Sequence, residues 1–185
     1  MYHGRISVEL DPENPLTLGL YVEVLRVAGK CEEALHYGKK AYSIDTDNIF
    51  STGRLRDAYI CSGDYQSAFE TWEKIKYNHW ESLGVRELLE KTFHEQGWTA
   101  FIKELTRINK EIMELDPQEL AYNMAHKYFL LGDYEKSMDN YEILFEINNH
   151  FPDLPYISCK PTYDKMKDNP KYLALLKNMN LPLTD

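Results

Sequence analysis

Two short stretches decide the fold, and they are nearly the same: Gly63-Asp64-Tyr65-Gln66-Ser67-Ala68 and Gly132-Asp133-Tyr134-Glu135-Lys136-Ser137. Each begins with glycine, aspartate and tyrosine, and each ends five residues later on a small side chain. Gly29 and Gly97 extend the pattern, because the four glycines are separated by 34, 34 and 35 residues. A fixed period of this length is typical of proteins built from one recurring supersecondary unit.

The residues around each glycine explain the period. A short turn between antiparallel helices needs a residue that tolerates positive φ, and glycine does so without strain. Two positions recur relative to the glycines: five residues after them stand Ala34, Ala68, Ile102 and Ser137, and four residues before them stand Leu25, Tyr59, Phe93 and Tyr128. A small residue fits where two helices cross closely, so Ile102 predicts a wider or shifted crossing in the third unit.

The apolar spacing between the turns is helical. Trp98, Phe101, Ile102, Leu105 and Ile108 follow the i, i+3, i+4, i+7 pattern of one apolar helix face. The sequence predicts four helix pairs, at residues 15–28 with 31–44, 48–62 with 65–77, 82–95 with 98–114, and 118–131 with 134–147. Since no stretch alternates as a strand would, the expected fold class is all-α.

These stretches resemble the tetratricopeptide repeat (TPR), which has Gly-x-Tyr-x-x-Ala at its inter-helix turn. Trp72 and Tyr141 occupy the aromatic position of that pattern, and Asp11-Pro12 and Asp116-Pro117 match its closing element, whereas Gly38 and Thr106 depart from it. The resemblance implies a right-handed TPR superhelix of antiparallel helix pairs with a concave groove.

The ends of the chain differ from the repeats. We expect residues 1–14 to be the end of a preceding repeat or an N-terminal cap, residues 15–149 to form about four TPR-like pairs, and residues 150–185 to form a connector and C-terminal capping helices. Pro170–Leu181 should dock on the helix from Tyr134 to Ile147, near Tyr141 and Leu144. We expect three apolar side chains of this segment to face inward, namely Leu173, Leu176 and Met179. We expect three polar ones to face water, namely Lys171, Lys177 and Asn178.

The C-terminal tail also resembles one that follows TPR arrays in bacterial multidomain regulators. There a proline, an aromatic-Asp pair, an Asp-Pro and a Leu-Leu precede a Leu-Pro end, as Pro161, Tyr163-Asp164, Leu175-Leu176 and Leu181-Pro182 do here. The resemblance implies the sensory or regulatory part of a larger bacterial protein.

Composition narrows the class of protein. Of 185 residues, 43% are apolar and the net charge is −9, which fits a folded chain. The acidic pI of about 5.2 argues against direct binding of nucleic acid, and no apolar run approaches the roughly 18 residues of a membrane span. Cys31, Cys61 and Cys159 are widely spaced and form no CxxC motif, so we expect small packed residues in a cytoplasmic protein. A periplasmic location is the alternative if the parent protein carries an upstream anchor.

Motifs of catalysis are not evident in the sequence. Gly29-Lys30 lacks the earlier glycine of a phosphate-binding loop, and the stretch from Asp45 places Ile49 and Phe50 where a calcium loop needs an oxygen ligand and a glycine. His94-Glu95 lacks the second histidine of a zinc helix. The expectation is therefore a protein that is not an enzyme, with no metal and no cofactor.

The first helix of each TPR pair lines the concave groove, so counting back from the turn glycines identifies candidate partner-binding residues. They are Glu23, Arg26, Asp57, Glu87, Lys91, His94, Tyr122, His126 and Phe129. The carboxylate clamp by which some TPR domains hold acidic C-terminal peptides is missing, because Gly19 and Glu23 occupy its first two places.

Two hypotheses follow for the function. The first is a non-enzymatic interaction module that binds a peptide or protein in its groove. The alternative is a self-association or packing domain, in which the chain's own helices or those of another copy in a homo-oligomer fill the groove.

Overall fold

The computed structural model describes residues 2–75, 84–111, 115–152, 154–159 and 164–182. Over these ranges the protein is helical and contains no strand, which confirms the all-α class. The chain divides into two compact units, Met1–Tyr77 and Asn78–Asp185, and each is described by itself. Within the described residues, none of the helices combines the length and the hydropathy that a membrane crossing requires.

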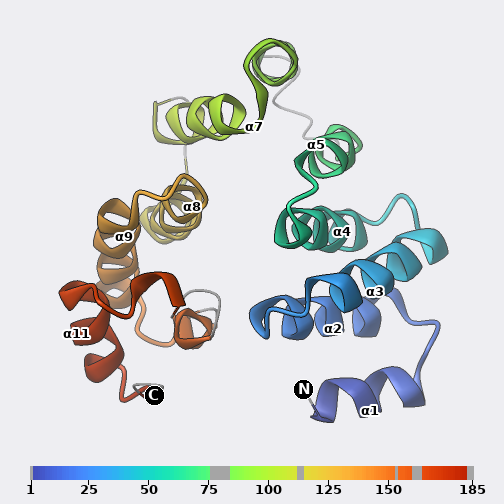
Figure 1. Ribbon diagram of the computed structural model, residues 1–185, viewed down its shortest axis with the longest axis horizontal. Helices are drawn as coiled ribbons and strands as arrows, with labels where there is room; N and C mark the ends of the chain where they lie inside the picture. The colour runs from blue at the N-terminus through green and yellow to red at the C-terminus, as the bar shows by residue number, and fades with distance from the viewer. Residues whose placement is uncertain (1, 76–83, 112–114, 153, 160–163, 183–185) are drawn as a thin grey trace. The chain divides into compact units, whose positions relative to one another are not determined.

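The first unit is a run of antiparallel helices (Figure 1). Its elements are α1 (Tyr2–Leu10), α2 (Pro15–Val27), α3 (Cys31–Ile44), α4 (Ile49–Ser62) and α5 (Tyr65–Glu73). Each helix packs on the next along the chain, and α2 also packs on α4. The first helices of two successive pairs therefore lie side by side, as a helical repeat requires.

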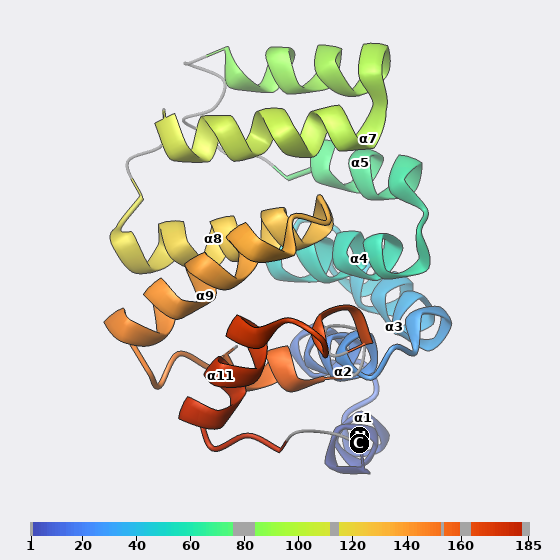
Figure 2. The same ribbon diagram turned by 60° about the vertical axis from the view of Figure 1, so that its left-hand side comes forward.

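The second unit is also built of helices (Figure 2). Its elements are α7 (Val85–Glu111), α8 (Pro117–Leu130), α9 (Tyr134–Ile147), a 3₁₀ turn η1 (Leu154–Ser158) and α11 (Pro170–Asn178). Where they are described, helix ends fall within about two residues of the predicted ones, except that α5 ends at Glu73. The ends predicted at 77, 82 and 114 lie outside the described residues, and the division at residues 14 and 149 stays a prediction.

Asparagine or aspartate begins most of these helices. Its side-chain oxygen accepts backbone N–H groups of the first turn, which would otherwise lack a partner. The capping residues are Asn14, Asn48, Asp64, Asp116, Asp133 and Asn169. Asn169 caps the last helix, directly before Pro170 in its first turn.

In each of the near-identical Gly-Asp stretches, the glycine ends one helix and the aspartate caps the next. Gly63 has φ 78° and ψ 8°, and its N–H donates to the Ile60 carbonyl, while the N–H of Asp64 donates to the Tyr59 carbonyl. This pair of bonds is the Schellman motif, which ends a helix on a left-handed glycine. Asp64 then caps α5 by accepting the N–H of Ser67, so that two residues reverse the chain.

The same two bonds recur at Gly29 (φ 72°) and Gly132 (φ 76°). The turn predicted at these glycines is therefore confirmed, and its backbone geometry is shared.

The third turn has a different form. Gly97 has φ 79° but ψ −173°, an extended left-handed region that is essentially restricted to glycine. Trp98 follows it in place of the capping aspartate, and the non-helical backbone of Gly97 separates the two helices that the label α7 covers. The turn and the division into two helices at Gly97 were both predicted correctly, while the outer ends predicted at 82 and 114 lie outside the described residues.

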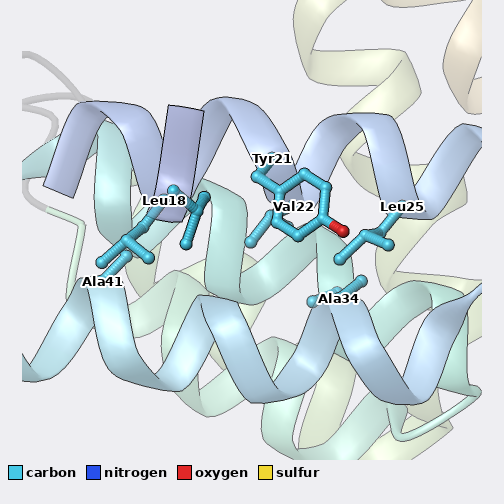
Figure 3. Close-up of a cluster of buried hydrophobic side chains, with 8 residues drawn as sticks. Leu18, Tyr21, Val22, Leu25, Ala34 and Ala41 are labelled. Carbon is cyan, nitrogen blue, oxygen red and sulfur yellow. The ribbon is translucent and has the colours of Figure 1, made fainter. Parts of the chain in front are cut away.

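The core of the first unit is built on the inner face of α2 (Figure 3). Leu18, Val22 and Leu25 are fully buried and point toward Ala34 and Ala41 of α3. The small side chains let the two helices approach closely, as the position of Ala34 five residues after Gly29 predicts.

Ala68, Ser137 and Ile102, at the equivalent positions, are also buried. The hydroxyl of Ser137 on α9 donates to the backbone carbonyl of Ala125 on α8 at 2.8 Å.

The packing around Gly38 explains why glycine replaces the aromatic residue of the repeat pattern at this position. It is buried where α3 crosses α4, and a Cβ at this position would lie 3.3 Å from the Leu55 Cα and 3.6 Å from the Ala58 Cβ. An aromatic side chain such as Trp72 has no room here without separating the two helices.

The C-terminal helix packs on α9 (Figure 2). Tyr172, Leu175 and Leu176 of α11 are buried with Met138 of α9, and Tyr141 packs against them. The predicted docking is confirmed, but the inward stripe is shifted, since Leu173 and Met179 are only partly buried. Lys171, which was expected in water, is half exposed, and its ammonium pairs with Asp139.

The cysteines correct one expectation. Cys31 and Cys61 form a disulfide with a Cα–Cα distance of 5.3 Å, so they are not the separate packed residues that their spacing suggested. They are 30 residues apart in sequence, and only the packing of α3 on α4 brings them together.

Candidate functional site

The candidate residues of the first unit form one ionic network across α2 and α4. Both Glu23 oxygens accept bonds from Arg26, at 3.0 and 2.5 Å, and Glu23 Oε2 also accepts Arg54 Nη1 at 2.8 Å. The Arg54 bond joins two helices, whereas Arg26 lies one turn along α2 from Glu23 and orients its carboxylate.

Asp57 completes the network on α4. Arg54 Nη1 lies 3.7 Å from one Asp57 oxygen, and Arg56 donates to the other at 2.8 and 3.0 Å. The Arg54 guanidinium also stacks over the Phe50 ring, with 5.0 Å from its central carbon to the ring centroid. Glu23, Asp57 and the Phe50 ring therefore all contact the Arg54 guanidinium, so its orientation is fixed.

This surface, which we call the α2–α4 face, comprises Glu23, Arg26, Arg54, Arg56 and Asp57. Its carboxylates are the more buried partners, with side-chain exposures of 13% for Glu23 and 19% for Asp57, against 27–30% for the arginines. Its charged groups are three guanidinium groups and two carboxylates. The face can thus offer arginine N–H donors to backbone carbonyls or to a carboxylate of a partner.

The place where a carboxylate clamp would begin is filled. Gly19 is buried in α2, and a Cβ at Gly19 would lie 2.4 Å from Cε1 of Phe50. A lysine or asparagine at this position would displace that ring from beneath Arg54.

Three candidates of the second unit share the first part of α7. Glu87, Lys91 and His94 are spaced by four and three residues and are all exposed. Lys91 lies 4.0 Å from Glu95, and the His94 ring contacts the edge of Phe93 with centroids 5.8 Å apart. This α7 strip is a hydrated, mixed-charge surface.

The remaining candidates lie on α8 and are half-buried. Tyr122 is half-buried against Phe151, with centroids 5.0 Å apart, in a cluster that also holds Leu144 and Leu154. His126 is half-buried as well.

Phe129 packs on Tyr134 at 5.6 Å and lies beneath the ammonium of Lys165 at 5.2 Å. It belongs to the same cluster as Tyr172 of α11. Residues of the C-terminal segment therefore lie against Tyr122 and Phe129, which both keep part of their surface exposed, and their role toward a partner stays a prediction.

Sequence reasoning missed Phe50, Arg54 and Arg56. Counting back from Gly63 in helical steps reached Asp57, and one further step of three residues would have reached Arg54. Phe50 carried no such signal, because its role depends on the absence of a side chain at Gly19 on another helix.

No group of three or more His, Cys, Asp or Glu side chains is arranged to hold a metal ion in the part of the chain that the structure describes. Comparison with known families and with curated proteins finds no match for this chain. The resemblance to TPR proteins thus rests on the residues of the turns and on the helix pairing.

Proposed function

We propose that this chain is a non-enzymatic interaction module of the TPR type, a right-handed superhelix that binds a peptide or protein through the first helices of its pairs. The observation that carries the proposal is the bond between Arg54 and Glu23. It joins the first helices of two successive pairs and gathers the predicted charges into one network. In helical repeats, adjacent first helices form the recognition surface.

The ligand that suits the α2–α4 face best is an extended peptide. Arg54 and Arg26 are oriented by carboxylates, so binding immobilises few side chains that were mobile before. An extended peptide presents carbonyl oxygens and acidic side chains to such guanidinium groups. The tail that resembles those of bacterial regulators favours a cytoplasmic regulatory role, in which this module senses the partner.

The test selects ligands from random sequences, so the natural partner need not be identified first. A random peptide library displayed on phage is panned against the full chain, and enriched peptides are measured by calorimetry against wild type and Arg54→Ala. We expect a loss of about 1–3 kcal/mol in binding free energy for Arg54→Ala, the range for a central anchor. Arg107→Ala is the matched control, because the exposed Arg107 of α7 pairs with Glu104 and Glu111 of the same helix.

Peptides that bind Arg54→Ala as tightly as wild type, with the fold intact by circular dichroism, would contradict the α2–α4 face. A library that yields no ligand above background would contradict peptide binding altogether.

One observation favours the alternative of a packing domain. Tyr122 and Phe129 already have contacts with Phe151 and Lys165 of the C-terminal segment. Light scattering over a hundredfold range of concentration separates the hypotheses. A mass that stays at one chain supports the interaction module, whereas a dimer that dissociates on Arg54→Ala places a second copy on the α2–α4 face.

A further inference from the structure

The Cys31–Cys61 pair lies at a structural junction. Cys31 is the first residue of α3, and Cys61 lies in the last turn of α4. Their Cα atoms are 5.3 Å apart, within the range that a disulfide bridges without moving the backbone. Folding alone therefore brings the two thiols to bonding distance.

The bond acts next to the α2–α4 face. Cys61 follows Asp57 by four residues and so lies one helical turn further along α4. Cys31 begins the helix that follows α2 after the turn at Gly29. The disulfide consequently ties the end of α4 to the point where α2 passes into α3.

Both cysteines are half-buried, so a small thiol can reach them. The helices α3 and α4 also pack closely away from the bond, since a Cβ added at Gly38 would lie only 3.3 Å from the Leu55 Cα. Opening the disulfide should loosen the junction while the helices stay paired.

We propose that Cys31 and Cys61 form a redox-responsive clasp, a thiol–disulfide exchange site that fixes the α2–α4 face when oxidised and loosens it when reduced. The co-reactants are a small dithiol and its disulfide. The clasp is independent of the proposed function, since it concerns the rigidity of this face whether or not a partner binds there.

The exchange proceeds in two balanced steps. One thiolate of the dithiol attacks a sulfur of the Cys31–Cys61 bond, a mixed disulfide forms, and the other cysteine leaves as a thiolate. The second thiol of the reagent, as its thiolate, then displaces the bound cysteine and closes the reagent's own disulfide. Two electrons pass from the dithiol to the protein, whose cysteines take up two protons; the reverse steps reseal the clasp.

The experiment uses the full chain with Cys159→Ser, so that only the clasp cysteines remain. The protein is equilibrated in buffers of reduced and oxidised dithiothreitol, alkylated and weighed by mass spectrometry. Thermal melts and amide hydrogen exchange are recorded at both extremes. Cys31→Ser and Cys61→Ser in the same background are the matched controls.

We expect no alkylated thiols in the oxidised protein and two in the reduced protein. Reduction should lower the melting temperature by roughly 6–15 °C and speed amide exchange in the last turn of α4 by about tenfold or more. Neither control should respond to the reductant. Two labelled thiols under oxidising conditions, a melting temperature that reduction does not move, or the same shift in the controls would overturn the clasp.

Discussion

At the residue scale, the turn glycines adopt two different positive-φ conformations, one at Gly63 and another at Gly97. A Cβ at Gly63 or Gly97 would have no neighbour within 4 Å, so replacement by alanine tests conformation alone. We expect Gly63→Ala to cost about 1–2 kcal/mol, the cost of a left-handed non-glycine residue. Gly97→Ala should cost more, up to about 3 kcal/mol, because its φ and ψ are accessible essentially to glycine only.

Urea denaturation of each variant measures these differences, and Gly53 supplies the control. It lies inside α4 without a positive φ, and a Cβ added there would also have no neighbour within 4 Å. Gly53→Ala should therefore stabilise by about 0.5–1 kcal/mol. Equal losses at Gly63 and Gly97 would show that the backbone at Gly97 relaxes.

Two buried serines offer a second comparison at this scale. The hydroxyl of Ser137 donates to Ala125, whereas that of Ser51 has no hydrogen-bond partner in the described part of the chain. Ser137→Ala should therefore cost about 0.5–1.5 kcal/mol, while Ser51→Ala should be neutral or stabilise by about 1 kcal/mol. Denaturation curves of both variants check the prediction, and a clear loss at Ser51 would reveal a bridging water there.

At the scale of the element, α11 is a cap whose removal should be costly. The side chain of Tyr172 is fully buried, and its hydroxyl donates to the Ile157 carbonyl at 2.8 Å. We expect Tyr172→Ala to cost about 3–5 kcal/mol and Tyr172→Phe about 0.5–1.5 kcal/mol. Thermal and urea unfolding measure both, with exposed Lys177→Ala as the neutral control. If Tyr172→Ala melts like wild type, α11 does not stabilise the unit.

The elements also show what sequence can and cannot predict. The turns at Gly63 and Gly132 were predictable because the glycine and the following aspartate act through bonds to residues close by in the chain. The turn at Gly97 was also predictable from its period, but its backbone form was not, since Trp98 there replaces the capping aspartate. The docking of α11 followed from its apolar spacing, but the rotation that buries Tyr172 depends on the shape of α9.

The site was less predictable than the fold for the same reason. Helical counting found Glu23 and Asp57, but the residue that joins them, Arg54, acts between helices. The Cys31–Cys61 bond is likewise a product of tertiary packing. Local periodicity carries no information about contacts between helices, so these pairs could not be predicted from the sequence.

For the whole molecule, the charged helix caps and surface ion pairs predict that the folding stability is highest at intermediate pH and falls at low and at high pH. The backbone N–H of Ser67 lowers the pKa of Asp64, and the Lys136 ammonium lowers the pKa of Asp133. A lowered carboxyl pKa gives stability that is present above the unfolded value and lost as pH falls through the folded one. Bonding to Asp139 raises the pKa of Lys171, so its contribution is present below the unfolded value and lost as pH rises through the folded one.

The melting temperature should therefore be highest between about pH 5 and pH 10 and decline on both sides. Asp64→Asn keeps an oxygen that can cap the helix but cannot titrate. The melting temperature of this variant should therefore fall less than that of the wild type as the pH falls from about 5 to about 2.5. Lys171→Gln removes the alkaline loss instead and should leave the acid side unchanged. Circular-dichroism melts across this range test both directions at once. Curves that stay parallel to wild type for both variants would mean that these bonds are too hydrated to affect folding, and that other groups set the plateau.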